Sequence, residues 1–252
     1  PSAEGRWVLT DVVQAFRPAK GGPAEKADLK VRTTSWAAAW AHQLLARHGV
    51  LTREAVASEG TSGGFGVVYP VLKAMEEAGK IRRGYFIAGL GATQFALPGA
   101  LDLLRSLRDP SPDNVDVEVV VLAATDPASP YGAAVRWPAS AEGTAPASAG
   151  RGPTRSVGAS VILVDGALAA YLARGDRQLL TFLPDNEPQR PKTARAIARA
   201  LRERSRTPVG DEQSPRGMLI EEIDGVPPSA HPIAPHLAKA GFHTGALGFQ
   251  AH

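Results

Sequence analysis

The fold is decided by two blocks of sequence, TTSWAAAWAHQLLARHGVLTREAVASEG (residues 33–60) and FGVVYPVLKAMEEAGKIRRGYFIAGLGATQFALP (residues 65–98). Apolar residues at helical spacing predict helices over 33–48 and 65–78, and Thr52 is a suitable N-cap for a short helix between them. Two strands are predicted over 80–87 and 93–97, because a glycine-rich turn separates them. Three helices followed by a hairpin are the element order of a winged helix.

Outside these blocks, the sequence predicts further segments on both sides. Residues 1–32 have no long hydrophobic period and are expected to be a lead-in segment. The winged-helix domain is expected over 33–109, including a helix that Pro98 opens. A second domain is predicted over 115–252, with a flexible loop at 138–156, where Ala, Ser, Gly and Pro dominate. The fold class predicted for the chain is therefore α+β.

The second domain is predicted to contain a small antiparallel sheet with flanking helices. The apolar run 117–124 has the length of a strand, and we expect it to be buried from residue 119 onward. Asp165-Gly166 lies between two apolar runs, which is a strong hairpin signal. It predicts a meander over 159–183 that curls into a small sheet or barrel. A helix over 190–206 and a strand–helix–strand unit over 218–249 that closes the sheet complete the prediction.

The composition limits the functions that this chain can have. Its 252 residues carry a formal net charge of +3 and include no cysteine, which excludes a disulfide scaffold and a cysteine-based zinc site. The 6 histidines are scattered, so no metal site is expected. No apolar run approaches the roughly 20 residues that span a bilayer, and a cytoplasmic, nucleoid-associated protein is expected. Because residue 1 is proline, we expect a segment of a longer protein.

A winged helix predicts contact with nucleic acid, and basic residues lie where such contact is expected. One set lies on the third helix and at the start of the wing, and a second set recurs at helical spacing within 190–206. The residues predicted to bind DNA are Lys73, Lys80, Arg82, Arg83, Arg195, Arg199 and Arg202. Such residues bind phosphates without reading the base sequence. The alternative is that they are ordinary solvated charges, or that the helical unit only packs against a neighbour.

Four phrases of this sequence go together: GRW (5–7), HGVLTREAVASEG (48–60), GGFGVVYPVLKAMEEAGKIRRGYFIAGLGATQFALPGALDLLR (63–105) and DPASPYG (126–132). Through them the chain resembles the C-terminal region of bacterial large helicase-related (Lhr) proteins. The resemblance implies an ATP-dependent DNA helicase whose motor, with its ATP and Mg²⁺, lies upstream. It also implies similarity to winged-helix DNA glycosylases and a uracil glycosylase activity. The segment has no GxxxxGK[ST] phosphate loop, so no cofactor is expected within it.

Excision of a base requires a carboxylate beside the flipped nucleotide and an aromatic or apolar wall. Asp126 is the catalytic candidate, because it follows the strand at 117–124 and begins the loop that holds Tyr131. Tyr131 and Trp137 are the candidates for stacking on a base. The alternative is that Asp126 only accepts hydrogen bonds from nearby backbone N–H groups, since Asp-Pro commonly starts a turn.

Three functions therefore remain open. The first is a nucleic-acid-binding accessory region of a DNA repair helicase, whose partners are single-stranded or duplex DNA and the upstream helicase core. The second is a DNA glycosylase that acts on a flipped base. The third is a protein-interaction module that forms homo-oligomers, because the apolar share of the helix over 33–48 suits an interface.

Overall fold

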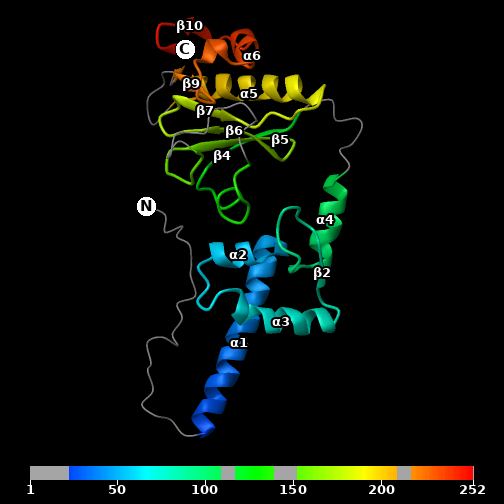
Figure 1. Ribbon diagram of the computed structural model, residues 1–252. Helices are drawn as coiled ribbons and strands as arrows, with labels where there is room; N and C mark the ends of the chain where they lie inside the picture. Colours follow the sequence, from blue (N-terminus) through cyan, green and yellow to red (C-terminus); the bar gives the residue numbers. More distant parts are fainter. Residues whose placement is uncertain (1–22, 109–116, 139–151, 209–216, 252) are drawn as a thin grey trace.

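The computed structural model describes residues 23–108, 117–138, 152–208 and 217–251 of the chain. They form a helical first unit and a second unit built on a five-stranded sheet (Figure 1). The second unit holds helices together with antiparallel and parallel strand pairs, so the α+β class is confirmed. Within these ranges, no helix combines the length and the apolar content that crossing a membrane requires.

The first unit is a winged helix, as predicted. Its elements are α1 (Pro23–His48), β1 (Val50–Leu51), α2 (Arg53–Ser58), α3 (Phe65–Glu77), β2 (Arg82–Gly84), β3 (Gln94–Ala96) and α4 (Pro98–Arg108). The three strands form an antiparallel sheet in the order β1-β3-β2. The Thr52 hydroxyl caps α2 by accepting the N–H of Ala55 at 3.1 Å, which confirms the predicted N-cap.

Three details of this unit differ from the sequence prediction. Helix α1 begins at Pro23, inside the predicted lead-in segment, because proline is tolerated in a first helical turn and PAEKA is rich in helix formers. Val50–Leu51, for which no helix or strand was predicted, is a strand that pairs with β3. The wing strands have 3 residues each, because the backbone between them bonds to a side chain instead of continuing the ladder.

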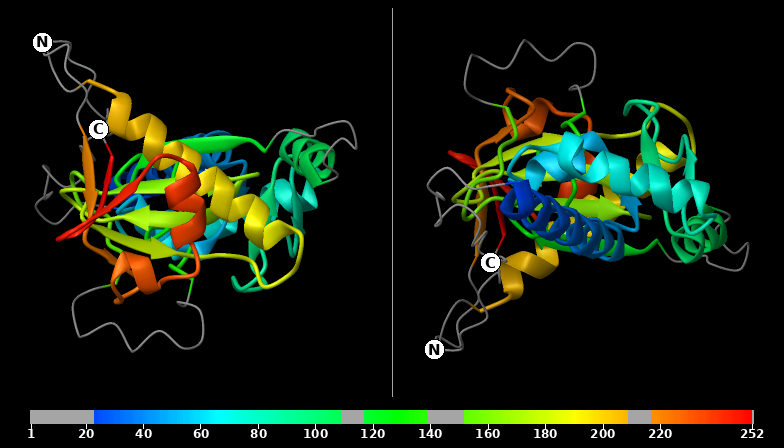
Figure 2. Two further views of the ribbon diagram at one scale, coloured as in Figure 1. Left: turned by 90° about the horizontal axis from the view of Figure 1, so that it is seen from above. Right: turned by 90° about the horizontal axis from the view of Figure 1, so that it is seen from below.

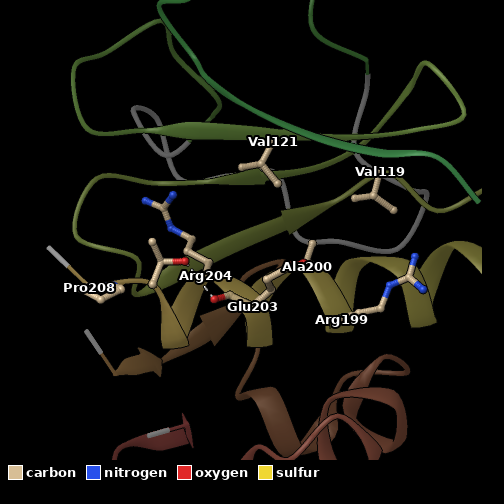
Figure 3. Close-up of a pocket in the computed structure, with 8 residues that line it drawn as sticks. Val119, Val121, Arg199, Ala200, Glu203, Arg204 and Pro208 are labelled. Atoms are coloured by element: carbon tan, nitrogen blue, oxygen red, sulfur yellow. Dashed lines mark hydrogen bonds between the residues drawn. The ribbon is translucent and has the colours of Figure 1, made fainter. Parts of the chain in front are cut away.

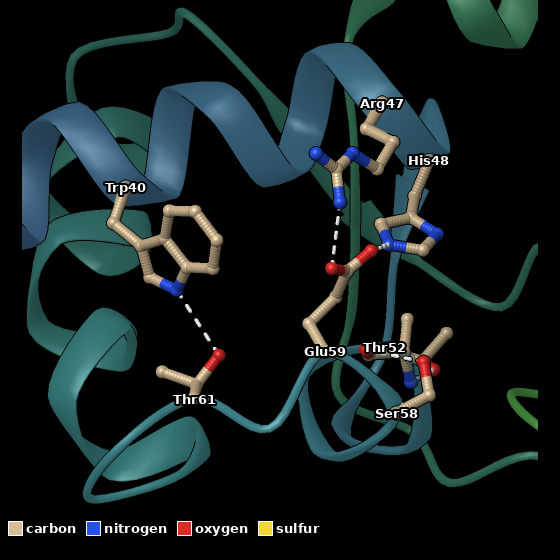
Figure 4. Close-up of polar contacts among 8 residues, drawn as sticks. Trp40, Arg47, His48, Thr52, Ser58, Glu59 and Thr61 are labelled. Atoms are coloured by element: carbon tan, nitrogen blue, oxygen red, sulfur yellow. Dashed lines mark hydrogen bonds and ion pairs between the residues drawn. The ribbon is translucent and has the colours of Figure 1, made fainter. Parts of the chain in front are cut away.

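A single hydrophobic core holds the first unit together. The buried members come from α1, α2, α3, β3 and the residue before β2, and include Leu44, Leu45, Val56, Val68, Leu72, Met75, Ile81 and Phe95. Trp40 lies at the side of this core and donates from its indole N–H to the Thr61 hydroxyl at 3.0 Å (Figure 4). Trp40 therefore contributes to packing, as its helical spacing predicts.

Glu59 ties the end of α2 to the end of α1. Its carboxylate accepts hydrogen bonds from Arg47 at 2.6 Å and pairs with His48 at 2.9 Å (Figure 4). Burial alone would raise the pKa of Glu59, but the hydrogen bonds from Arg47 and His48 outweigh it and hold the pKa below its usual value. The Glu59 carboxylate therefore stays ionised at neutral pH.

The second unit is organised on a sheet with the strand order β4-β5-β6-β7-β9. Its strands are β4 (Val119–Ala123), β5 (Ser160–Val164), β6 (Ala167–Leu172), β7 (Gln178–Thr181) and β9 (Glu222–Ile223). The predicted meander is confirmed, and the turn between β5 and β6 has positive φ at both Asp165 (49°) and Gly166 (78°). Two positive φ angles are typical of the type I′ turn, which fits the twist of a hairpin.

Of the two predicted forms, a small sheet or a barrel, the structure has the open sheet, because β4 and β9 form two edges of the described sheet. The expectation that β4 is buried is wrong. As an edge strand it leaves Val120 and Val121 exposed by 37% and 42%. Local periodicity predicted the strand but carries no information about which neighbours it acquires.

Helix α5 (Gln189–Arg206) lies across one face of this sheet, and Figure 2 shows it from above. Its predicted stripe, Ala194, Ile197, Ala198 and Leu201, is buried. The other side of α5 is covered by η2 (Pro228–Ala230), α6 (Ala234–Lys239) and a second sheet of β8 (Met218–Ile220), β10 (His243–Gly245) and β11 (Gly248–Ala251). The prediction that the C-terminal elements close the first sheet is therefore wrong, because β8, β10 and β11 form a sheet of their own and only β9 joins the first one.

A candidate nucleic-acid interface

The wing carries three exposed cationic side chains of the first unit. Arg82 and Arg83 lie on β2, and both side chains are exposed, as is Lys80 just before the strand. Among the described residues, none of these three has a carboxylate oxygen within 4.0 Å. Lys73 on α3 instead lies 3.8 Å from Glu77. The wing is therefore better suited than α3 to bind phosphates.

The backbone of the wing is shaped by the buried side chain of Gln94. Its Oε1 accepts the N–H groups of Phe86 and Ile87, each at 2.9 Å. Its Nε2 donates to the carbonyl oxygens of Ile87 and Gly91, each at 3.0 Å, and to that of Leu90 at 3.5 Å. One amide thus replaces the strand ladder over Phe86–Gly91. This role of Gln94 was not predicted, although a polar residue at the start of the apolar run FAL was a signal for it.

The second basic surface lies on α5 and divides into free and packed residues. Arg195 and Arg199 are exposed. Arg202 is half-buried, donates to the Ser205 hydroxyl at 3.2 Å and packs beside Gly241. Lys239 of α6 belongs to this surface, because it and Arg195 both lower the pKa of His236, after the larger lowering that burial causes. The second basic surface therefore combines positively charged side chains from α5 and α6.

A groove of about 530 Å³ runs between β4 and α5. Its lining residues are Val119, Val121, Arg199, Ala200, Glu203, Arg204, Thr207 and Pro208 (Figure 3). Arg204 pairs with Asp176 at 3.1 Å, so its charge is compensated. Arg199 projects from α5 at the end of the groove near Val119. The groove thus has an apolar floor and mixed charges, and Arg199 extends the basic surface to its edge.

Asp126 lies at the start of the loop over 125–137, and its Oδ1 accepts the N–H of Ala128 at 2.8 Å. This is the turn-forming role that the sequence analysis gave as the alternative to catalysis. Among the described residues, Oδ2 has no hydrogen-bond partner. The carboxylate therefore stabilises the turn with one oxygen and leaves the other available.

Arg155 holds this loop through four backbone carbonyl oxygens. One guanidinium nitrogen donates to Ser129 at 2.7 Å and Tyr131 at 3.2 Å, and the other donates to Thr125 and Asp126, each at 3.2 Å. Residues 139–151 of the predicted flexible loop lie outside the described residues, but Arg155 is ordered by these bonds. No pattern in the sequence predicts these four hydrogen bonds.

Tyr131 and Trp137, the predicted base-stacking residues, contact each other. Their ring centroids are 6.1 Å apart with an interplanar angle of 22°, and Trp137 also makes an edge contact with Tyr171 at 5.5 Å. The Tyr131 hydroxyl accepts the N–H of Leu168 at 3.3 Å. Both rings are half-buried against the face of the sheet opposite α5. The structure uses them mainly for packing.

A half-buried acid–histidine pair forms a further polar cluster in the second unit. Asp224 accepts two hydrogen bonds from Thr181, at 2.8 Å and 2.5 Å, and lies 2.9 Å from Nε2 of His231. The Ile233 N–H donates to the other ring nitrogen at 3.2 Å. Every named group is satisfied, so the cluster ties β7 to the segment after β9. In the described ranges, no three His, Asp or Glu side chains gather as a metal site would require.

Comparisons with known proteins identify one family match and two relatives of this chain. Residues 30–116 match the family described as "Large helicase-related protein, winged-helix domain". The chain is 41% identical over 227 residues to the "Lhr helicase/ probable uracil glycosylase" of Mycolicibacterium smegmatis, covering 90% of this chain and 13% of that protein. It is 31% identical over 248 residues to the "Lhr helicase/uracil glycosylase" of Escherichia coli, covering 98% and 14%. The chain thus spans a small part of the length of these relatives.

Proposed function

This chain belongs to the large helicase-related (Lhr) family, and from that premise we propose that it is a DNA-binding accessory region of a longer DNA repair helicase. The observation that carries the proposal is the pair Arg82 and Arg83 on the wing, exposed and without a carboxylate partner among the described residues. Arginine side chains in that state bind phosphates, because no internal ion pair must first be broken. Arg195 and Arg199 supply a second contact region, and the helicase motor of the longer protein is the covalent partner.

The double substitution Arg82→Gln/Arg83→Gln tests this role. Because two phosphate contacts are lost, we expect the affinity for duplex and single-stranded DNA to fall by at least about tenfold, and the slope of log K against log salt to decrease by about 2. Fluorescence anisotropy of labelled DNA, titrated at several salt concentrations, measures both quantities.

Arg105→Gln/Arg174→Gln is the matched control, since it removes the same charge from exposed positions outside the two proposed contact regions. If the control lost as much affinity as the wing variant, net charge alone would account for binding. If wild-type binding did not depend on salt, phosphate contact would be excluded as its basis.

A second candidate function is excision of uracil, because the names of both relatives include it. In this chain the group that supports it is Asp126, whose Oδ2 is available beside the Arg155-held loop. Asp126→Asn keeps an oxygen that accepts the Ala128 N–H, so the turn is expected to persist. If the carboxylate activates water, the rate of abasic-site formation in uracil-containing DNA falls by about 10²–10⁴. Alkaline cleavage of the DNA measures this rate, and an unchanged rate would remove Asp126 from the reaction.

A further inference from the structure

Tyr85 is the one exposed aromatic side chain among the described residues. It is 77% exposed, whereas every other described Phe, Tyr or Trp is buried or half-buried. It directly follows β2, which carries Arg82 and Arg83. A large ring left in water on the wing, close in sequence to two arginines, contributes little to packing, because it buries little apolar area. The position therefore points to a ligand rather than to the core.

The neighbouring aromatic residue shows that this exposure is built into the wing. The ring of Phe86 lies on the backbone of Gly84, where an added Cβ would be 3.0 Å from it. Phe86 is thus folded back onto the strand, and only the ring of Tyr85 projects. Glycine at position 84 provides the space for this arrangement.

The backbone on both sides of Tyr85 is fixed. Gly84 pairs with Gln94 in the β2–β3 ladder, and the N–H of Phe86 donates to the Gln94 side chain at 2.9 Å. Gln94 thus holds the chain on both sides of Tyr85, at Gly84 through its backbone and at Phe86 through its buried side-chain amide. A ring presented from a fixed backbone loses little conformational entropy when it binds.

We infer that Tyr85 is a stacking platform for an unpaired base of a nucleic-acid strand, whose phosphates contact Arg82 and Arg83. Aromatic stacking on a base tolerates any sequence, since every base has a π face. In a duplex these faces are covered by neighbouring base pairs, so the platform favours single-stranded DNA. This inference rests on the proposed DNA binding and adds to it a preference for unpaired strands.

The experiment compares Tyr85→Ala with Tyr85→Phe in the whole chain. The probes are a thymidine oligonucleotide of about 15 nucleotides and a blunt duplex of two fully complementary strands of similar length. Tyr85→Ala is expected to lower the affinity for the single strand about tenfold or more and to leave that for the duplex within about twofold. Tyr85→Phe keeps the stacking ring and is expected to match the wild type. An oligonucleotide carrying one 2-aminopurine reports stacking directly, as quenching that Tyr85→Ala removes.

Leu247→Ala is the control, because it removes another strongly exposed side chain, 66% exposed and located in the second unit. Equal losses on single strand and duplex, or a Tyr85→Phe variant as weak as Tyr85→Ala, would overturn the stacking platform while DNA binding stands. The same holds if Tyr85→Ala binds the single strand like wild type. A wild-type chain that binds neither probe would overturn the proposed function together with this inference.

Discussion

Gln94→Ala is expected to destabilise the first unit by about 3 kcal/mol, because it leaves several polar backbone groups without a hydrogen-bond partner at once. The N–H groups of Phe86 and Ile87 and the carbonyl oxygen of Gly91 lose their partner. Each polar group left unsatisfied in a partly buried site costs about 1–3 kcal/mol, and water admitted by the smaller side chain offsets part of the sum. Urea unfolding followed by tryptophan fluorescence measures the loss as a lower midpoint.

Gln43→Ala is the matched control, since it makes the same chemical change at an exposed position on α1. It is expected to change the free energy of unfolding by less than about 0.5 kcal/mol. Gln94→Ala is also expected to reduce the preference for single strands, because it releases the backbone on one side of Tyr85. An unchanged urea midpoint would show that the wing keeps its shape without the Gln94 amide.

Arg155→Ala is expected to release the loop over 125–137 and to destabilise the second unit by about 2–3 kcal/mol. Four carbonyl oxygens lose a charged donor in one substitution. Arg155→Lys is expected to restore less than half of the loss, since one ammonium group cannot reach four acceptors in the geometry of the guanidinium fork. Hydrogen exchange of the amides of Ser129, Gly132 and Val135 reports the opening of the loop, and urea unfolding reports the loss of stability.

Arg136→Ala serves as the control for this variant, because Arg136 is an exposed arginine in the same loop. Its removal is expected to leave amide exchange in the loop within about twofold of the wild type. If Arg155→Ala left the exchange rates equally unchanged, the loop would be held by the packing of Tyr131 and Trp137 and not by the guanidinium.

The elements that the sequence predicts well are those that depend on neighbouring residues. The Thr52 cap, the apolar stripe of α3 and the stripe of α5 are local patterns, and the structure confirms them. The Asp165–Gly166 turn is equally local and fixes the meander. Winged-helix topology followed from the order of these elements, because short connections leave few alternatives.

Apart from the start of α1, which depends on local helix propensity, the failures concern contacts between distant segments. The run over 218–223 reads as one strand, but its two halves pair in different sheets, and no residue inside the run shows this. The supports of the candidate site were missed for the same reason, since Arg155 reaches carbonyl groups 24 to 30 residues earlier in the chain. Exposure is also a long-range property, so the sequence did not set Tyr85 apart from the half-buried Tyr131.

The division of one strand between two sheets has a consequence for how the second unit comes apart. Only Glu221 separates β8 from β9, and β8 pairs with β11 while β9 pairs with β7. Met218, Ile220 and Ile223 all enter the core under α5. Neither sheet can therefore unfold without disrupting the pairing of the other. The second unit is expected to unfold in one cooperative step. A force applied to β11 is transmitted through β8 and Glu221 to β9 and the five-stranded sheet.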